Sequence, residues 1–232
     1  MKVLVAAVGR NVTKFEVGDR AGVGCMVDSC MRCDSCTHGE EQHCENGETL
    51  VTYGYPDRRS PTGITQGGYS TNIVVTEHFA VHIPEYIPLE EAAPLLCAGI
   101  TTYSPIVQAN DVSSNRGTYR GMLDYMISTI PVQYAVASYA SVVKPHGHFT
   151  QVGMPEAFEL TLSAIGLSMS RVNFNASLIG GIPETQEVIH YCADSDVRPT
   201  IQIIPAEQVN DAWNKVVNRD RHTTTLEPDK HI

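Results

Sequence analysis

The amino-acid sequence predicts a two-part chain, in which a β-rich unit with a cysteine-rich loop precedes an α/β unit with parallel strands. Three observations carry this prediction. Short apolar runs separated by turn residues fill roughly residues 1–85. Five of the seven cysteines fall within residues 25–44. From Pro88 onward, apolar strand-like and helix-like segments alternate, which is typical of an α/β architecture.

Composition narrows the class of protein. The chain has 232 residues, 42% of them hydrophobic, and its 16 Lys and Arg against 26 Asp and Glu give a formal net charge of −10. The apolar content argues against disorder, and the acidic balance argues against nucleic acid or an anionic membrane as a partner. The longest apolar run near the start, residues 3–8, is too short for a membrane span or a secretory signal. We expect a cytoplasmic globular protein.

Four cysteines in the loop at residues 28–46 have the spacing of a metal site. Two C-x2-C steps link Cys30, Cys33 and Cys36, and Cys44 follows after seven residues. Tetrahedral zinc takes four ligands, and a two-residue spacer lets neighbouring thiolates converge on one ion. We predict that these four cysteines bind a structural zinc with no open position for a substrate.

Three alternatives fit this loop less well. A disulfide framework suits a small secreted domain, but the cysteine total is odd. The bacterial ferredoxin pattern needs a proline after its last cysteine, whereas Glu45 follows Cys44. Unligated packing cysteines do not gather in so polar a loop. Cys25 and Cys192 lie outside the pattern, and we expect both to be packing residues.

The first unit is predicted to contain strands at residues 3–8, 21–27, 69–75 and 79–83, separated by polar turns. Cys25 falls inside the second of these runs, which makes it a candidate strand core residue. Such short strands with turn signals indicate a small β-barrel-like unit.

The second part begins with a helix at Pro88, where proline suits the first helical position and the acidic residues Glu90 and Glu91 suit the first turn. Trp213 is expected to be a core anchor of the last helix, and residues 220–232 lack periodicity and are expected to fray. The predicted strands are 124–130, 147–152, 172–179 and 200–204, and the predicted helices are 132–143, 160–169, 183–193 and 206–217.

With these elements in place, the chain resembles the zinc-dependent medium-chain alcohol dehydrogenases, in the cinnamyl alcohol dehydrogenase-like branch. The resemblance implies a GroES-like catalytic domain over residues 1–105, a remnant of a Rossmann NADP-binding domain over 106–179, and a segment over 180–232 that returns to the catalytic domain. Besides the cysteine loop, the stretches that carry it are residues 17–24, 67–70, 93–105, 127–131, 151–155 and 177–185.

The resemblance implies an activity and its site residues. The activity is NADP(H)-linked interconversion of aldehydes and primary alcohols, with a small-molecule aldehyde or alcohol as partner and a possible homodimer. Cys97 matches the last protein ligand of the catalytic zinc. The positions that match the nicotinamide side of the cofactor site are Thr101, Thr129, Gly153, Ser177, Leu178 and Ile179.

The chain also departs from the family pattern at two places. The other catalytic-zinc ligands of the family, a cysteine and a His-Glu pair, are expected upstream of Met1. The glycine-rich phosphate turn is expected after residues 103–105, yet only 18 residues, 106–123, precede the next predicted strand. We therefore expect an N-terminally truncated and internally deleted chain. Its alternative function is that of a catalytically inactive, zinc-stapled structural or dimerisation module.

Overall fold

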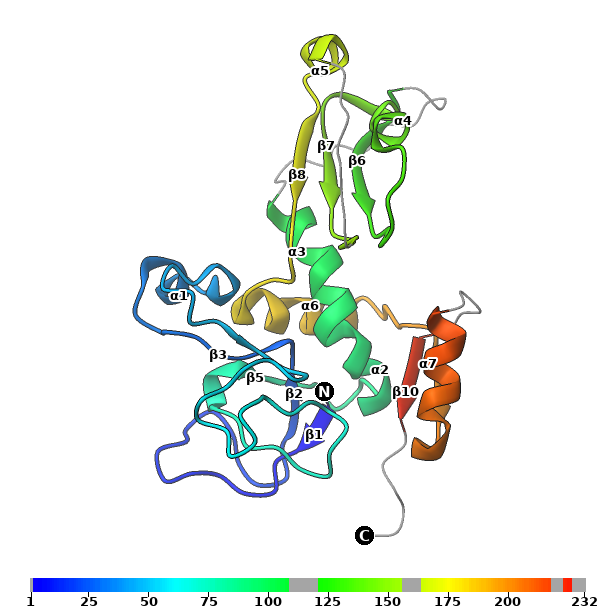
Figure 1. Ribbon diagram of the computed structural model, residues 1–232. Coiled ribbons are helices and arrows are strands. Elements are labelled where there is room, and N and C mark those ends of the chain that lie inside the picture. The colour runs from blue at the N-terminus through cyan, green and yellow to red at the C-terminus, as the bar shows by residue number, and fades with distance from the viewer. Residues whose placement is uncertain (1, 109–120, 156–163, 218–222, 227–232) are drawn as a thin grey trace. The chain divides into compact units, whose positions relative to one another are not determined.

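The computed structural model describes residues 2–108, 121–155, 164–217 and 223–226. It separates into two compact units (Figure 1). Unit 1 comprises Met1–Ile100 and Gly180–Ile232, and unit 2 comprises Thr101–Ile179. None of the described helices is long and apolar enough to cross a membrane.

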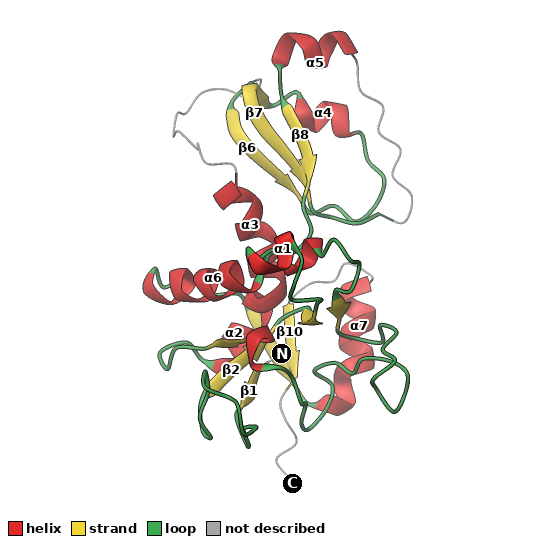
Figure 2. Ribbon diagram, turned by 90° about the vertical axis from the view of Figure 1, so that its left-hand side faces the viewer, coloured by secondary structure: helices red, strands yellow, loops and turns green. Residues whose placement is uncertain are grey.

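Unit 1 begins with short antiparallel strands joined by long loops (Figure 2). One sheet has the order β1-β2-β5, and β3 pairs with β4 in a second sheet. The strands are β1 (Lys2–Leu4), β2 (Arg20–Val23), β3 (Met26–Asp28), β4 (Leu50–Val51) and β5 (Ala80–His82).

Three strand predictions need correction. The predicted strand at 3–8 is shorter, and the one at 21–27 is two strands that break at Gly24 and Cys25. The predicted strand at 69–75 is wrong, because the structure assigns no strand to these described residues. Val74 there is 99% exposed, and Val75 packs on the cluster of Phe15, Ala21 and Ala80, so this run contacts the core without a partner strand among the described residues.

A continuous helical segment follows β5. It comprises α2 (Leu89–Pro94), a π-helical turn (Leu95–Gly99) and α3 (Ile100–Gln108), with Pro88 as the N-cap residue rather than the first helical residue. The π-helical turn packs closely on β2, since a Cβ atom at Gly22 would lie only 2.7 Å from Cδ1 of the buried Leu96.

The cysteine-rich loop forms a small lobe, residues 28–46, that contains α1 (Asp34–Thr37) and a 3-10 turn (Glu41–His43). The helix α6 (Ile182–Asp194) packs against this lobe through backbone. A Cβ atom at Gly181, the N-cap residue of α6, would lie 1.7 Å from the carbonyl oxygen of Gly39. Only glycine permits this approach.

The same helix covers the edge strand β5. The side chain of Gln186 accepts a hydrogen bond from the backbone N–H of His82 at 2.7 Å and donates one to its carbonyl at 3.0 Å. Backbone groups of an edge strand are free to pair with another chain unless something satisfies them. Gln186 therefore satisfies the backbone N–H and carbonyl of His82 at the outer edge of the β1-β2-β5 sheet.

Unit 1 ends with β9 (Ile201–Ile204), a 3-10 turn (Ala206–Gln208), α7 (Val209–Val217) and β10 (Thr223–Leu226). β10 pairs in parallel with β9. The predicted fraying of residues 220–232 is therefore wrong for 223–226, and the rest of that stretch lies outside the described residues.

The predicted core role of Trp213 is also wrong. Trp213 is 63% exposed, and Val216 and Val217 on the same helix are exposed as well. Amphipathic periodicity shows that a helix has an apolar face, but it does not show that a neighbour covers that face.

Unit 2 contains a three-stranded parallel sheet with the order β6-β7-β8 (Figure 1). Its strands are β6 (Leu123–Ser128), β7 (Val143–Gln151) and β8 (Asn173–Ala176), and its connections contain α4 (Val136–Ala140) and α5 (Ala164–Ser170). This alternation was expected, although α4 is much shorter than the helix predicted at 132–143.

The core of unit 2 forms around β7. Phe149 is fully buried and stacks on Phe174 of β8 with 5.1 Å between the ring centroids. Val136 of α4 and Val143 pack in the same cluster. The short helix therefore contributes Val136 and Ala140 to this small core, and Tyr134 of the same connection packs against it.

We predict that Gly181→Ala destabilises the chain by about 3 kcal/mol or more, because the new methyl group meets backbone that cannot move aside. The measurement is the free energy of unfolding by chemical denaturation. The matched control is Gly9→Ala, where the nearest atom to the new Cβ is Val12 Cγ2 at 3.7 Å, an ordinary contact. Equal stability of the two variants would contradict the close packing.

Candidate metal centre and cofactor face

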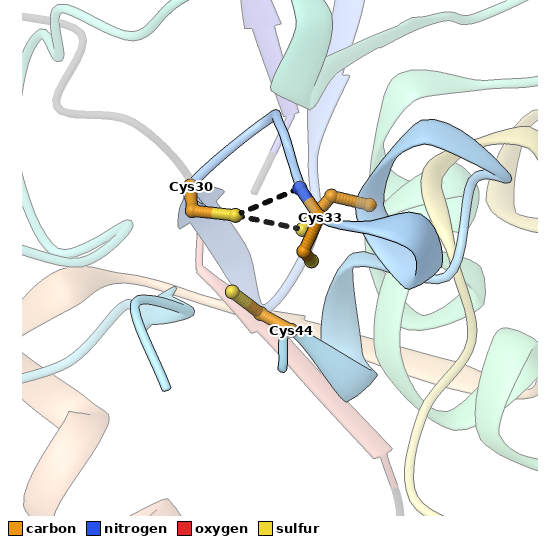
Figure 3. Close-up of side chains that lie close together, drawn as sticks. Cys30, Cys33 and Cys44 are labelled. Atoms are coloured by element: carbon orange, nitrogen blue, oxygen red, sulfur yellow. Dashed lines mark hydrogen bonds between the residues drawn. The ribbon is translucent and has the colours of Figure 1, made fainter. Parts of the chain in front are cut away.

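The four cysteines of the lobe converge on one point. Their sulfur atoms all lie within 4.8 Å of one another, and Cys30, Cys33 and Cys44 point toward each other in Figure 3. The Sγ atoms of Cys30 and Cys36 are 3.8 Å apart. Zinc at about 2.3 Å from four sulfurs in a tetrahedron places the sulfurs about 3.8 Å apart. The cluster therefore has the composition and spacing of a closed zinc site.

The chain turns sharply between the first two cysteines. Met31 has a φ of 56°, and the backbone N–H groups of Arg32 and Cys33 both point at the Cys30 sulfur, at 3.5 Å and 3.3 Å. Asn46 Nδ2 donates to the same sulfur at 3.2 Å. Donation from the Arg32 N–H outweighs desolvation and, with the other donors, lowers the pKa of Cys30 to about 6. This sulfur therefore loses its proton readily and can bind a metal as a thiolate.

Cys36 lies in a different environment. Burial raises the pKa of its thiol to about 12, and this thiol donates to Ser29 Oγ at 3.2 Å. A bound cation favours the deprotonated form of a coordinating thiol. Cys36 would therefore lose its proton to become a ligand only when the metal binds.

Glu41 is a site residue that the sequence analysis did not single out. Its side chain is fully buried, Oε1 lies 2.6 Å from Nε2 of His78, and Oε2 accepts the backbone N–H of Ile182 at 3.0 Å. Ile182 is the first residue of α6, where unpaired N–H groups and the helix dipole favour a carboxylate. Its position in a polar loop beside a cysteine cluster gave no sign of this long-range contact.

The structure corrects the expectation for Cys25. This residue lies in the break between β2 and β3. Interaction of its thiol with that of Cys97, in the π-helical turn, lowers the pKa of Cys97 to about 6 and raises that of Cys25. Cys97 is exposed and Cys25 is half-buried. Cys25 is thus not a strand core residue, whereas Cys192 is buried as expected.

An aromatic pair lies near these thiols. Tyr53 has a φ of 67° and packs edge-on against Tyr69 with 5.9 Å between the ring centroids. Burial raises the pKa of Tyr53, and the charges of Cys25 and Cys97 raise it further. A left-handed backbone at a non-glycine residue is uncommon and is often found at functional sites.

In unit 2, three of the predicted cofactor residues gather at one edge of the sheet. Thr129, Gly153 and Ser177 each follow the carboxyl end of a strand, those of β6, β7 and β8 respectively. A Cβ atom at Gly153 would lie 2.3 Å from the carbonyl oxygen of Ile130. Ligands of open parallel sheets bind outside the carboxyl ends of the strands. This arrangement is therefore a candidate cofactor face.

The remaining predicted cofactor residues are placed less uniformly. Leu178 and Ile179 continue from Ser177, Leu178 is exposed, and Ile179 has a φ of 45°. Thr101 lies at the start of α3, on a helix and not at a strand end. The predicted absence of a glycine-rich turn concerns residues 106–123, most of which lie outside the described residues.

A buried polar network supports this face and was not predicted. The Tyr134 hydroxyl lies 2.5 Å from both Ser128 Oγ and Gln151 Oε1. Gln151 Nε2 also donates to the carbonyl of Gly153 at 2.8 Å. Ser128 and Gln151 are buried, and such satisfied networks hold backbone in one arrangement. The network fixes the ends of β6 and β7 against each other.

Comparison with known proteins places this geometry in a family. Residues 4–85 match the alcohol dehydrogenase GroES-like domain family. The NADP-dependent alcohol dehydrogenase C 1 of Mycolicibacterium smegmatis is 36% identical over 271 residues, covering 94% of this chain and 77% of the relative. A probable cinnamyl alcohol dehydrogenase 3 of Oryza sativa subsp. japonica is 33% identical over 94% of this chain and 73% of the relative.

The chain belongs to the zinc-dependent medium-chain alcohol dehydrogenases, in the cinnamyl alcohol dehydrogenase-like branch.

Solved structures of this branch have the same fold as this chain. A cinnamyl alcohol dehydrogenase from Sorghum bicolor has a TM-score of 0.88 at 25% identity, covering 96% of this chain and 78% of that one. The protein named CAD from Helicobacter pylori, complexed with NADP(H), has a TM-score of 0.87 at 28% identity, covering 99% and 80%. The predicted fold class is confirmed: a GroES-like unit with a cysteine lobe, joined to an incomplete Rossmann unit.

The comparison also bears on the expected internal deletion. The match to the Mycolicibacterium smegmatis relative spans 271 residues, whereas the whole chain has 232. The relative therefore has internal residues that have no counterpart here.

The described residues do not complete a second metal site. Within them, the four lobe cysteines are the one group of at least three potential ligands. A catalytic zinc takes about three protein ligands and a water, and Cys97 belongs to no such group among the described residues. The described part of the chain therefore fits a closed zinc site and does not fit a catalytic one.

We predict that Glu41→Ala destabilises unit 1 by about 1–3 kcal/mol, because it leaves the buried N–H of Ile182 without its acceptor. Urea denaturation measures the change. Glu40→Ala removes an exposed carboxylate at the neighbouring position and should change stability by less than about 0.5 kcal/mol. If the two variants unfold at the same urea concentration, the Glu41 contact does not hold α6.

Proposed function

We propose that this chain acts as an NADP(H)-linked oxidoreductase that interconverts aldehydes and primary alcohols. The observation that carries the proposal is its 36% identity, over 94% of its length, to an NADP-dependent alcohol dehydrogenase. The NADP(H) complex of the Helicobacter pylori structure supports the cofactor. The strand-end face of unit 2 supports the location.

The residues of unit 2 would position the cofactor. Thr129, Gly153 and Ser177 would line the nicotinamide side, and Gly153 would let the dinucleotide approach the backbone closely. NADP(H), when bound, supplies or accepts the hydride. The part-buried hydrogen bonds between Tyr134, Ser128 and Gln151 would keep the strand ends in place while the ligand binds.

We further propose that Cys30, Cys33, Cys36 and Cys44 hold a structural zinc. The sulfur spacing and the N–H groups directed at Cys30 support this assignment. Four thiolates close the coordination sphere, so this metal would stabilise the lobe and would not touch a substrate.

A second candidate function follows from the lack of a second ligand group among the described residues. The chain would then be a zinc-stapled structural or dimerisation module without turnover. Zinc content separates the candidates: about one zinc per chain fits the module, and about two fit a completed catalytic site.

We also propose a homodimer and a cytoplasmic location. In the described part of unit 2, β8 pairs only with β7, so its other edge is available for a second copy. β6 is likewise unpaired on its outer side among the described residues, which makes it an aggregation risk.

Removal of the proposed structural zinc should unfold the lobe. We predict that Cys33→Ser lowers zinc content from about one to about zero per chain and lowers stability by about 3 kcal/mol or more, or roughly 6–12 °C in Tm. Elemental analysis and thermal denaturation measure the two effects. Cys97→Ser is the control and should retain the zinc. Loss of a zinc from the control would indicate a second, catalytic metal.

The proposed activity predicts that an aromatic or aliphatic aldehyde oxidises NADPH, and the measurement is the loss of NADPH absorbance.

The proposed activity also predicts that Thr129→Val weakens NADPH binding about tenfold, or about 1.4 kcal/mol, by removing a hydroxyl from the strand-end face. Ser138→Ala removes an exposed hydroxyl from α4 of the same unit and should leave the affinity unchanged. No binding and no turnover at millimolar cofactor would exclude the enzyme and leave the structural module.

A further inference from the structure

Two side chains of the cysteine lobe contact the sulfurs without being ligands. Asn46 Nδ2 lies 3.2 Å from the Cys30 sulfur, and Ser29 Oγ lies 3.2 Å from the Cys36 sulfur. Ser29 directly precedes the first cysteine of the cluster, and Asn46 follows the last one by two residues. The spacing of the four cysteines accounts for neither contact, because it specifies only the ligands.

Asn46 presents a donor to a sulfur that acts as an acceptor. A thiolate accepts hydrogen bonds, so the Nδ2 end of the amide suits it and the carbonyl end does not. The backbone N–H groups of Arg32 and Cys33 lie farther from the same sulfur, at 3.5 Å and 3.3 Å. The hydrogen bond from Asn46 joins positions 16 residues apart, and it therefore ties the end of the lobe to its first ligand.

The nearby cationic side chain does not replace this donor. The terminal nitrogens of Arg32 pair with the carboxylate of Glu48 and with the Cys30 carbonyl oxygen at 3.3 Å. Oxygen acceptors therefore hold the guanidinium, and the amide of Asn46 is the side-chain donor for the Cys30 sulfur.

Ser29 lies against the buried sulfur of Cys36. Both residues are buried, and the N–H of Met31 donates to Ser29 Oγ at 3.4 Å. With its proton, the Cys36 thiol donates to this hydroxyl. Once Cys36 is a metal ligand, the hydroxyl can donate in the reverse direction, because a hydroxyl is both donor and acceptor. A buried anionic sulfur needs such a donor, since little water reaches it.

The charge of the centre explains why such donors matter. Four thiolates carry more negative charge than one zinc ion neutralises, so a closed site of this kind is anionic. Hydrogen-bond donors around the sulfurs offset part of this charge and orient the ligands. Loss of such an outer group typically weakens metal binding about 10–100-fold.

We propose that Asn46 and Ser29 are positioning residues of the metal centre, which hold the Cys30 and Cys36 sulfurs in the orientation that zinc binding requires. This inference rests on the structural zinc proposed above and does not depend on dehydrogenase activity. The two residues act on different sulfurs, so their effects on zinc affinity should multiply.

The first test measures the zinc dissociation constant of the full chain by competition with a chromophoric chelator. We expect Asn46→Ala and Ser29→Ala each to raise this constant about tenfold, and the double variant to raise it about a hundredfold. Asn46→Asp keeps the shape of the side chain but places an acceptor beside the sulfur. It should therefore weaken zinc binding more than Asn46→Ala does.

Two substitutions are matched controls. Ser35→Ala removes a hydroxyl that lies next to Cys36 in the sequence but donates to Glu45 Oε1 at 3.0 Å. Asn72→Ala removes an exposed amide outside the lobe, whose Nδ2 donates to Thr71 Oγ1 at 3.4 Å. Both controls should bind zinc as tightly as the unaltered chain.

A spectroscopic measurement separates positioning of the sulfurs from a general loss of stability. Cobalt(II) bound in place of zinc absorbs light through charge transfer from sulfur to metal. A hydrogen bond lowers the energy of the sulfur lone pair, so its loss should move this absorption to longer wavelength in Asn46→Ala and Ser29→Ala. The absorption should not move in Ser35→Ala. Asn46 is exposed, so its variants decide the question if Ser29→Ala, at a buried position, fails to fold.

The outcomes separate this proposal from the proposed zinc site. If the unaltered chain binds one zinc and Asn46→Ala changes neither the affinity nor the cobalt absorption, the positioning role is wrong and the zinc site stands. An equal loss of affinity in Ser35→Ala would also overturn the positioning role. An unaltered chain that binds no zinc would refute the structural zinc and this proposal together.

Discussion

The buried carboxylate of Glu41 is the contact on which the arrangement of unit 1 depends. It joins the cysteine lobe to the first N–H of α6 and to His78, three segments that are distant in the sequence. A buried carboxylate is stable only where hydrogen-bond donors surround it. The helix end and the imidazole supply these donors, so the lobe, the loop before β5 and the returning C-terminal segment must assemble together.

A metal on the four cysteines would support this carboxylate contact. The lobe has few apolar residues, so the position of Glu41 within it depends on the four sulfurs that close the loop. The sulfurs in turn are oriented by backbone N–H groups of the sharp turn at Met31. Loss of the metal would therefore weaken the loop and the contact between Glu41 and the start of α6. It would also weaken the hydrogen bonds by which Gln186 of α6 satisfies the edge of β5.

The sequence predicted the parts of the fold that local rules control. The two C-x2-C steps placed the four cysteines correctly, and α6 and β9 differ from their predicted bounds by a residue or two. The errors have one physical origin. The outcome for Trp213, Cys25 and residues 223–226 depends on partners distant in the sequence, or on the lack of them, and periodicity does not specify these partners.

The candidate sites show the same division. Thr129 and Gly153 were predicted from the family resemblance, and the structure places both after the carboxyl ends of neighbouring parallel strands. Glu41, Tyr134 and Gln151 could not be predicted, since each matters through a hydrogen bond to another segment of the chain. Their residue types are common at the surface, and only burial distinguishes them.

The role of Cys97 illustrates how the surroundings decide the chemistry of a residue. A thiol holds a catalytic zinc only when two further protein ligands converge on the same ion. Within the described residues, Cys97 belongs to no group of three or more potential metal ligands. The glycines at positions 22 and 24 allow the backbone to pack closely on Leu96, the residue before Cys97, so the position of the π-helical turn is fixed by packing. The expected role of Cys97 therefore comes from the family resemblance, and the described residues do not supply the partners that this role needs.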